Sequence, residues 1–86
     1  SGKTLVAVAA ILAAVDSGAQ AVLMAPTEVL AQQHDIRIGR MLEPLGVRTA
    51  LLTGTLHAPE RRALLQALGA GEVHLLIGTT PSLRTR

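Results

Sequence analysis

The sequence predicts an α/β fold: a parallel sheet with flanking helices. Three short apolar runs alternate with helix-like stretches along the 86 residues, and the connections between them are short. That order is typical of right-handed βαβ units. Apolar types make up 49% of the chain, whereas aromatic types make up 0%. We therefore expect an aliphatic core, and no aromatic ring is available here for stacking on a nucleic-acid base.

The first expected helix covers residues 3–17, which are rich in Ala and Leu and apolar nearly all round. Gly18 ends it at the position after the last helical residue. Residues 21–25 form a continuous apolar run that stops at Pro26. Such a run is typical of a strand buried on both faces of a parallel sheet.

The second expected helix begins after Thr27, a residue type that caps helices well, and Glu28 adds a negative charge to its first turn. Gly46 ends this helix. We interpret His34 as a partly buried structural residue on its packing stripe. The other side chains expected on that stripe are Leu30, Ile38, Met41, Leu42 and Leu45.

Residues 47–52 and 73–77 form the second and third expected strands. The helix between them is expected to begin near Pro59. Its apolar side consists of Leu64, Leu65 and Leu68. The opening helix has no strand before it, so it is half of a βαβ unit. We therefore expect a fragment whose first strand lies outside these 86 residues.

The apolar start of the chain imitates a secretory signal, because Lys3 precedes an apolar run over residues 5–15. Asp16 closes this run where a cleavage region would be uncharged. The run also falls well short of the roughly 20 residues that span a bilayer. We expect neither a signal peptide nor a membrane helix.

The composition argues against several kinds of site. The chain has no cysteine, which excludes a disulfide, a thiolate zinc site and a cysteine nucleophile. Its histidines show no short metal-ligand spacing. The formal net charge of +2 is only weakly compatible with a polyanionic partner.

The most informative short motif is Ser1-Gly2-Lys3-Thr4, the second half of the phosphate-binding loop pattern G-x-x-x-x-G-K-[ST]. In that loop glycine amides wrap a phosphate, the lysine contacts the β- and γ-phosphates, and the hydroxyl ligates Mg²⁺. The motif opens a helix, precedes alternating strands and helices, and holds the only lysine of the chain. We predict that these four residues bind nucleotide, with Lys3 as the catalytic residue and Thr4 as the Mg²⁺ ligand.

Hydroxyl-bearing turns follow all three expected strands. They are Pro26-Thr27-Glu28, Thr53-Gly54-Thr55 and Gly78-Thr79-Thr80. Ligands of open α/β sheets bind at the carboxyl ends of the strands, and each turn offers hydroxyls and amides to an anion there. Each turn alone is at least as well explained as a strand-end turn or a helix cap, but together they indicate an anion-binding edge.

Longer stretches resemble the RecG-type DNA helicases of superfamily 2. The matching stretches are MAPTEVLAQQH at 24–34, LEPLG at 42–46, LLTG at 51–54 and IGT at 77–79. The resemblance covers nearly the whole chain, in the order of that family's first RecA-like motor domain. It implies an incomplete RecA-like P-loop NTPase domain over residues 1–86 that begins inside the phosphate-binding loop.

The resemblance implies a cytoplasmic, monomeric enzyme that couples ATP hydrolysis, with Mg²⁺, to movement on branched DNA in recombination and repair. Its partners would be ATP and branched or single-stranded DNA, without a membrane. Residues 1–4 match motif I. Contacts with the DNA backbone then fall on Pro26, Thr27, Thr53, Gly54, Gly78 and Thr79.

Three other interpretations remain open. Transcription-repair coupling factors share much of the pattern, and after Thr79 this chain has Thr-Pro-Ser-Leu where RecG-like sequences usually have His-Ala-Leu-Ile. A P-loop kinase for a small molecule would keep motif I, and a non-enzymatic α/β module could contain Gly-Lys-Thr by chance. No Asp-Glu pair follows an apolar strand, so we expect the water-positioning residue to lie elsewhere and this chain alone to be inactive.

Overall fold

The computed structural model describes residues 2–79. In chain order its elements are α1 (Gly2–Asp16), β1 (Ala21–Ala25), α2 (Glu28–Leu42), the 3₁₀ turn η1 (Glu43–Leu45), β2 (Thr49–Leu52), α3 (Ala58–Gly69) and β3 (Leu75–Thr79). The strands form one sheet in which every neighbouring pair is parallel. The predicted α/β class and the predicted alternation of helices and strands are confirmed.

The start of β2 differs from the prediction, because this strand begins at Thr49 rather than at Val47. The N–H of Val47 donates to the carbonyl of Leu42 at 3.3 Å, which keeps the chain at the end of the preceding helix. The N–H of Arg48 donates to Nδ1 of His74 at 2.9 Å. These residues therefore use hydrogen bonds outside the strand ladder.

The strands are arranged in the order β1-β3-β2, so β3 is the central strand. Ala25 of β1 pairs with Thr79, and Leu52 of β2 pairs with Gly78. The structure thus continues β3 to Thr79, beyond the predicted end at Ile77. As a result the strands end level with one another, and the residues that follow them gather at one edge.

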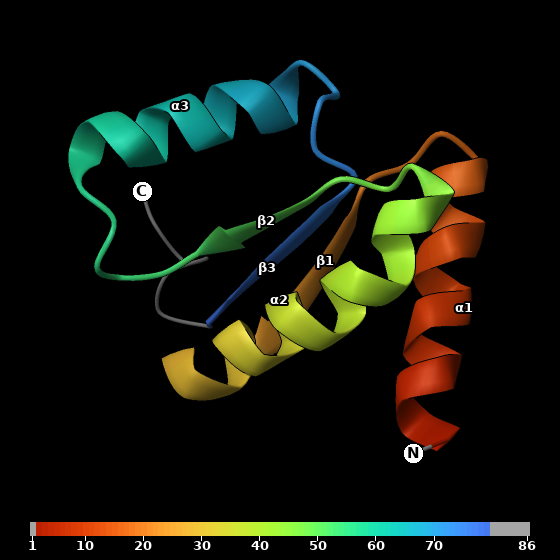
Figure 1. The fold of residues 1–86 in the computed structure, drawn as a ribbon. Coiled ribbons are helices and arrows are strands. Elements are labelled where there is room, and N and C mark those ends of the chain that lie inside the picture. Colours follow the sequence, from red (N-terminus) through yellow and green to blue (C-terminus); the bar gives the residue numbers. More distant parts are fainter. Residues whose placement is uncertain (1, 80–86) are drawn as a thin grey trace.

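Helices α1 and α2 pack against each other over the sheet, whereas α3 lies against β2 (Figure 1). The connection through α2 passes β3 to reach β2, and the connection through α3 returns from β2 to β3. Right-handed crossovers in opposite directions place their helices on opposite faces. The core cluster is aliphatic, as predicted, and consists of Ile11, Ala25, Ala31, Ile38, Leu42, Val47, Leu75 and Ile77.

The packing stripe predicted for α2 is wrong in part. Ile38 and Leu42 are buried as predicted, together with Ala31, and His34 is half-buried. The predicted residues that are instead exposed are Leu30, Met41 and Leu45. Leu30 and Met41 are the sequence neighbours of the buried Ala31 and Leu42, so they lie to one side of the buried face. Leu45 lies in η1, after the α-helix has ended.

Strand β1 and helix α1 are less covered than predicted. Val22 and Met24 of β1 are 58% and 52% exposed, because β1 is an edge strand among residues 2–79 and α3 lies over the β2 side of the sheet. Ile11 is the buried residue of α1, and Leu5 and Val6 are exposed. The expectation of a strand buried on both faces is therefore wrong for β1 in the described residues.

In the part of the chain that the structure describes, no helix combines the length and the apolar character that crossing a membrane requires. Over the same residues, no three His, Asp or Glu side chains come together in a way that would hold a metal ion.

Candidate functional site

The carboxyl ends of the strands and the N-terminal ends of α1 and α2 lie at the same end of the molecule. Helix α1 packs antiparallel to β1, so its N-terminal end lies near the carboxyl end of that strand, and α2 begins directly after β1 (Figure 1). Ligands of open α/β sheets bind at this kind of edge. The predicted site residues found there are Gly2, Lys3, Thr4, Pro26, Thr27, Thr53, Gly54, Gly78 and Thr79.

Gly2, Lys3 and Thr4 of the phosphate-binding motif begin α1. Gly2 and Lys3 are exposed and Thr4 is half-buried, whereas Ser1 lies outside the described residues. The first turn contains no acidic residue, and Lys3 forms no ion pair within residues 2–79. The positive end of the helix and the lysine ammonium are therefore both available to an anion.

The turn after β1 holds a helix cap. Thr27 has an extended backbone, with φ −134° and ψ 160°, and its Oγ1 accepts a hydrogen bond from the N–H of Leu30 at 3.2 Å. The predicted cap is confirmed. Because Oγ1 acts as the acceptor in this bond, the hydroxyl hydrogen can still be donated to a second group. Pro26 and Thr27 are both exposed.

The turn after β2 is closed by its own hydrogen bonds. The N–H of Leu56 donates to the carbonyl of Thr53 at 3.3 Å, and the hydroxyls of Thr53 and Thr55 lie 2.9 Å apart. Thr53 is only 6% exposed, but Gly54 and Thr55 are exposed. The exposed part of this turn is therefore its tip, and the Thr53 side chain lies beneath it.

The end of β3 lies between these two turns. Gly78 pairs with Met24 on one side and Leu52 on the other, and Thr79 pairs with Ala25. Both residues are buried, with Thr79 at 3% exposure. The central strand therefore presents less side-chain surface at this edge than its neighbours do.

The structure brings to this edge a residue whose place in the sequence indicates only a first-turn helix charge. Glu28 begins α2, and its Oε2 accepts a hydrogen bond from the N–H of Gly54 at 2.7 Å. The bond joins the start of α2 to the turn after β2. The two residues are 26 positions apart, so no local sequence pattern could have revealed the contact.

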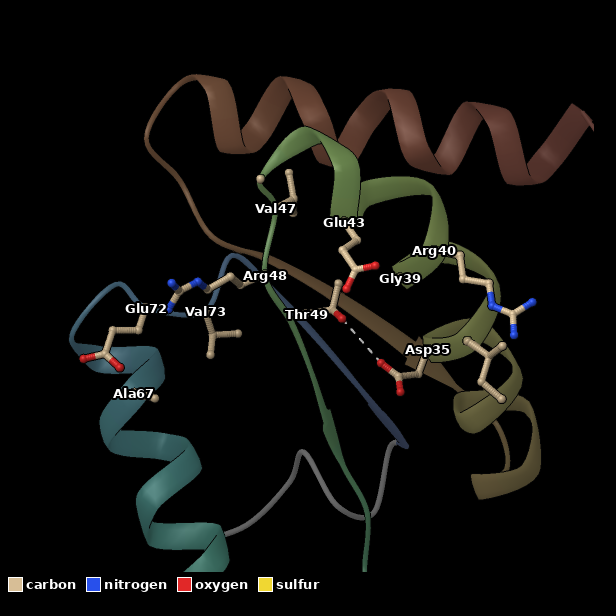
Figure 2. Close-up of a pocket in the computed structure, with 12 residues that line it drawn as sticks. Asp35, Gly39, Arg40, Glu43, Val47, Arg48, Thr49, Ala67, Glu72 and Val73 are labelled. Atoms are coloured by element: carbon tan, nitrogen blue, oxygen red, sulfur yellow. Dashed lines mark hydrogen bonds between the residues drawn. The ribbon is translucent and has the colours of Figure 1, made fainter.

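A separate hollow of about 900 Å³ opens near the starts of β2 and β3 (Figure 2). It is lined by both acidic and basic side chains, including Asp35, Glu72, Arg40 and Arg48. Asp35 accepts a hydrogen bond from the hydroxyl of Thr49 at 3.5 Å, and Figure 2 shows these two side chains pointing toward each other. None of the predicted site residues lines this hollow, so it is distinct from the edge described above.

Comparison with protein families gives one match that covers nearly the whole chain. The family model described as DEAD/DEAH box helicase matches residues 1–85. This match includes every residue of the predicted nucleotide-binding and DNA-binding sets.

The chain is also similar to curated proteins named ATP-dependent DNA helicase RecG. It is 49% identical to that of Treponema pallidum over 92% of this chain and 12% of the relative. The corresponding identities are 47% for Bacillus subtilis, over 12% of the relative, and 44% for Haemophilus influenzae, over 11%. The chain thus spans about a tenth of the length of these relatives.

Proposed function

Because this chain belongs to the DEAD/DEAH box helicase family, we propose that it forms part of the first RecA-like motor domain of a RecG-type, ATP-dependent DNA helicase. The whole protein would couple ATP hydrolysis to translocation on branched DNA in recombination and repair. We place it in the cytoplasm as a monomer, with ATP and DNA as its partners.

One observation supports this proposal above the others. A lysine at a helix N-terminus, with no ion pair among residues 2–79, lies at the same end of the sheet as two exposed polar turns. In a motor the nucleotide site and the nucleic-acid track must be coupled, so that binding at one changes the free energy of binding at the other. The sheet holds both turns close to the nucleotide site, and its register fixes the spacing of the strand ends.

At the nucleotide site, Ser1, Gly2, Lys3 and Thr4 would hold the phosphates of ATP, and the hydroxyl of Thr4 would ligate Mg²⁺. The metal supplies positive charge that neutralises the β- and γ-phosphates. Lys3 fits this assignment because its ammonium is exposed and forms no ion pair among the described residues. Gly2 is compatible with this assignment because, apart from its chain neighbours and the nearby backbone of α1, no atom of the described residues lies within 4 Å of the place a Cβ would take.

At the nucleic-acid edge, we propose that Pro26, Thr27, Thr53, Gly54, Gly78 and Thr79 together form the surface that binds the DNA backbone. Phosphate contacts of this kind position a protein on DNA without reading its sequence. The exposed residues among them, Pro26, Thr27 and Gly54, are suited to direct contact. The buried ones would support the same surface from below.

Substitution of Lys3 in the full-length protein tests the proposal. Lys3→Ala should reduce DNA-stimulated ATP hydrolysis by about 100- to 1,000-fold, because it removes the charge that faces the transferred phosphate. Binding of single-stranded DNA should change less than about twofold, since Lys3 lies in the nucleotide site. Arg62→Ala removes the same charge from an exposed position on α3 and is the matched control.

Two results would contradict the proposal. The first is that DNA does not stimulate ATP hydrolysis by the unsubstituted protein, which would favour a small-molecule kinase or a binding module. The other is unchanged hydrolysis in Lys3→Ala, which would remove the phosphate-loop assignment.

A further inference from the structure

A hydrogen bond between Glu28 and Gly54 links the two exposed turns. Its acceptor is the carboxylate Oε2 of Glu28 and its donor is the backbone N–H of Gly54, at 2.7 Å. Charge-assisted bonds of this length are stronger than neutral ones. The carboxylate also lies in the first turn of α2, where the positive end of the helix favours a negative charge.

We propose that Glu28 is a positioning residue for DNA: it holds the turn after β2 against the start of α2, so that both turns present their backbone contacts at a fixed spacing. This inference rests on the proposed function, because it concerns the same nucleic-acid edge. Glu28 itself does not contact DNA in this proposal.

The geometry explains why such a link is needed. The turns follow β1 and β2, which are separated by β3, so their strand ends lie about 10 Å apart. The register of β3 fixes the strands, but the tip of the turn, at Gly54 and Thr55, extends beyond the last pair of the ladder. Without the Glu28 bond the tip would be held only by the hydrogen bonds within its own turn, and DNA binding would have to fix its position relative to α2, which reduces affinity. Glu28 orders it before DNA arrives.

A different role for the same contact would give the opposite result. A carboxylate on a backbone N–H has the chemistry of a phosphate oxygen, so Glu28 could occupy the place where a DNA phosphate binds. In that case, removing the carboxylate would free the N–H of Gly54 and strengthen DNA binding. The sign of the effect of Glu28→Ala therefore separates a positioning residue from a competitor.

The experiment compares Glu28→Ala, Glu28→Gln and Glu60→Ala in the full-length protein. Glu60 is the matched control because it also lies in the first turn of a helix and accepts one backbone N–H, from His57 at 3.2 Å. Its bond stays within one turn of the chain, whereas the Glu28 bond joins two elements. The measurements are binding of labelled single-stranded DNA and the rate of ATP hydrolysis against DNA concentration.

Glu28→Ala should raise the Kd for DNA about five- to tenfold, which is below the roughly 10- to 150-fold that a hydrogen bond to a charged group can contribute, because Glu28 positions the turn and does not itself contact DNA. The DNA concentration for half-maximal ATP hydrolysis should rise by the same factor, with the rate at saturating DNA retained. Glu28→Gln keeps an acceptor oxygen and should restore binding to within about twofold of the parent. Glu60→Ala should also stay within about twofold.

Several results would overturn the inference. They are equal or tighter DNA binding by Glu28→Ala, an equal loss in Glu28→Gln, an equal loss in Glu60→Ala, or a fall in the saturated rate without a change in the half-maximal DNA concentration. Parent protein that neither binds DNA nor responds to it would instead overturn the proposed function, and this inference with it.

Discussion

Substitution of Thr27 can separate its structural role from its proposed contact with DNA. Oγ1 of Thr27 already accepts the capping bond from Leu30, so the residue contributes to the stability of α2 whether or not DNA binds. The remaining hydroxyl hydrogen is the group available to a phosphate oxygen. Three variants change these functions in different combinations: Thr27→Ser keeps both, Thr27→Asp keeps the cap but has no hydroxyl, and Thr27→Val loses both.

The expected magnitudes follow from these two bonds. Loss of the cap in Thr27→Val should cost about 0.5–2 kcal/mol of stability, which lowers the unfolding transition of a motor domain by roughly 2–4 °C for each kcal/mol. Loss of one hydrogen bond from the hydroxyl to a phosphate oxygen, which is a charged acceptor, should cost about 1.5–3 kcal/mol, or roughly 10- to 150-fold in Kd. Thr27→Asp should keep the transition temperature and weaken DNA binding most at low salt, where its charge repels the phosphates most strongly.

The assays are thermal unfolding and a salt titration of single-stranded DNA binding by the full-length protein. Thr27→Val should leave the slope of log K against log salt unchanged, because a neutral hydroxyl releases no counterion. The reasoning is refuted if Thr27→Val binds DNA as tightly as Thr27→Ser at every salt concentration. It is also refuted if Thr27→Asp binds DNA as tightly as the parent.

Two further predictions concern the backbone and the completeness of the chain. Gly39→Ala should raise stability by up to about 1 kcal/mol, because Gly39 lies in a helix and its Cβ would meet Thr49 Oγ1 at an ordinary 3.5 Å. Gly46→Ala should instead lower stability by about 1–2 kcal/mol, because Gly46 has a φ of +79°. Thermal unfolding of the two variants measures this difference. The isolated 86-residue chain should release no phosphate from ATP above background, since it has no acidic pair after a strand; steady release that disappears in Lys3→Ala would contradict this.

Local patterns predicted the elements well because each depends on residues close in sequence. The strand at Ala21–Ala25 has the predicted bounds, since an apolar run and Pro26 define both its character and its end. The cap at Thr27 was predicted for the same reason, because its bond spans only three residues. The alternation of such elements was enough to give the fold class.

Contacts between distant segments could not be predicted in this way. The bonds from Gly54 to Glu28 and from Arg48 to His74 each join residues 26 positions apart. The packing stripe predicted for α2 is partly wrong for a related reason. This helix carries apolar residues on more than one side, so its periodicity allows several neighbouring stripes, and the sheet selects the one that contains Ala31. The exposure of Val22 and Met24 likewise depends on which elements cover β1.

The threonines at the strand ends look equivalent in the sequence, but they differ in exposure in the structure. Thr27 is exposed, whereas Thr53 and Thr79 are 6% and 3% exposed. Valine at either buried position would change packing and hydrogen bonding at the sheet edge, so a loss of DNA binding there could not be assigned to a lost phosphate contact. At Thr27 the group that faces outward can be changed while the cap is kept. The proposed DNA track is therefore best tested at the ends of the outer strands. The positions to change are Thr27, which follows β1, and Glu28, which binds the tip of the turn after β2. The buried end of β3 lies between these two positions.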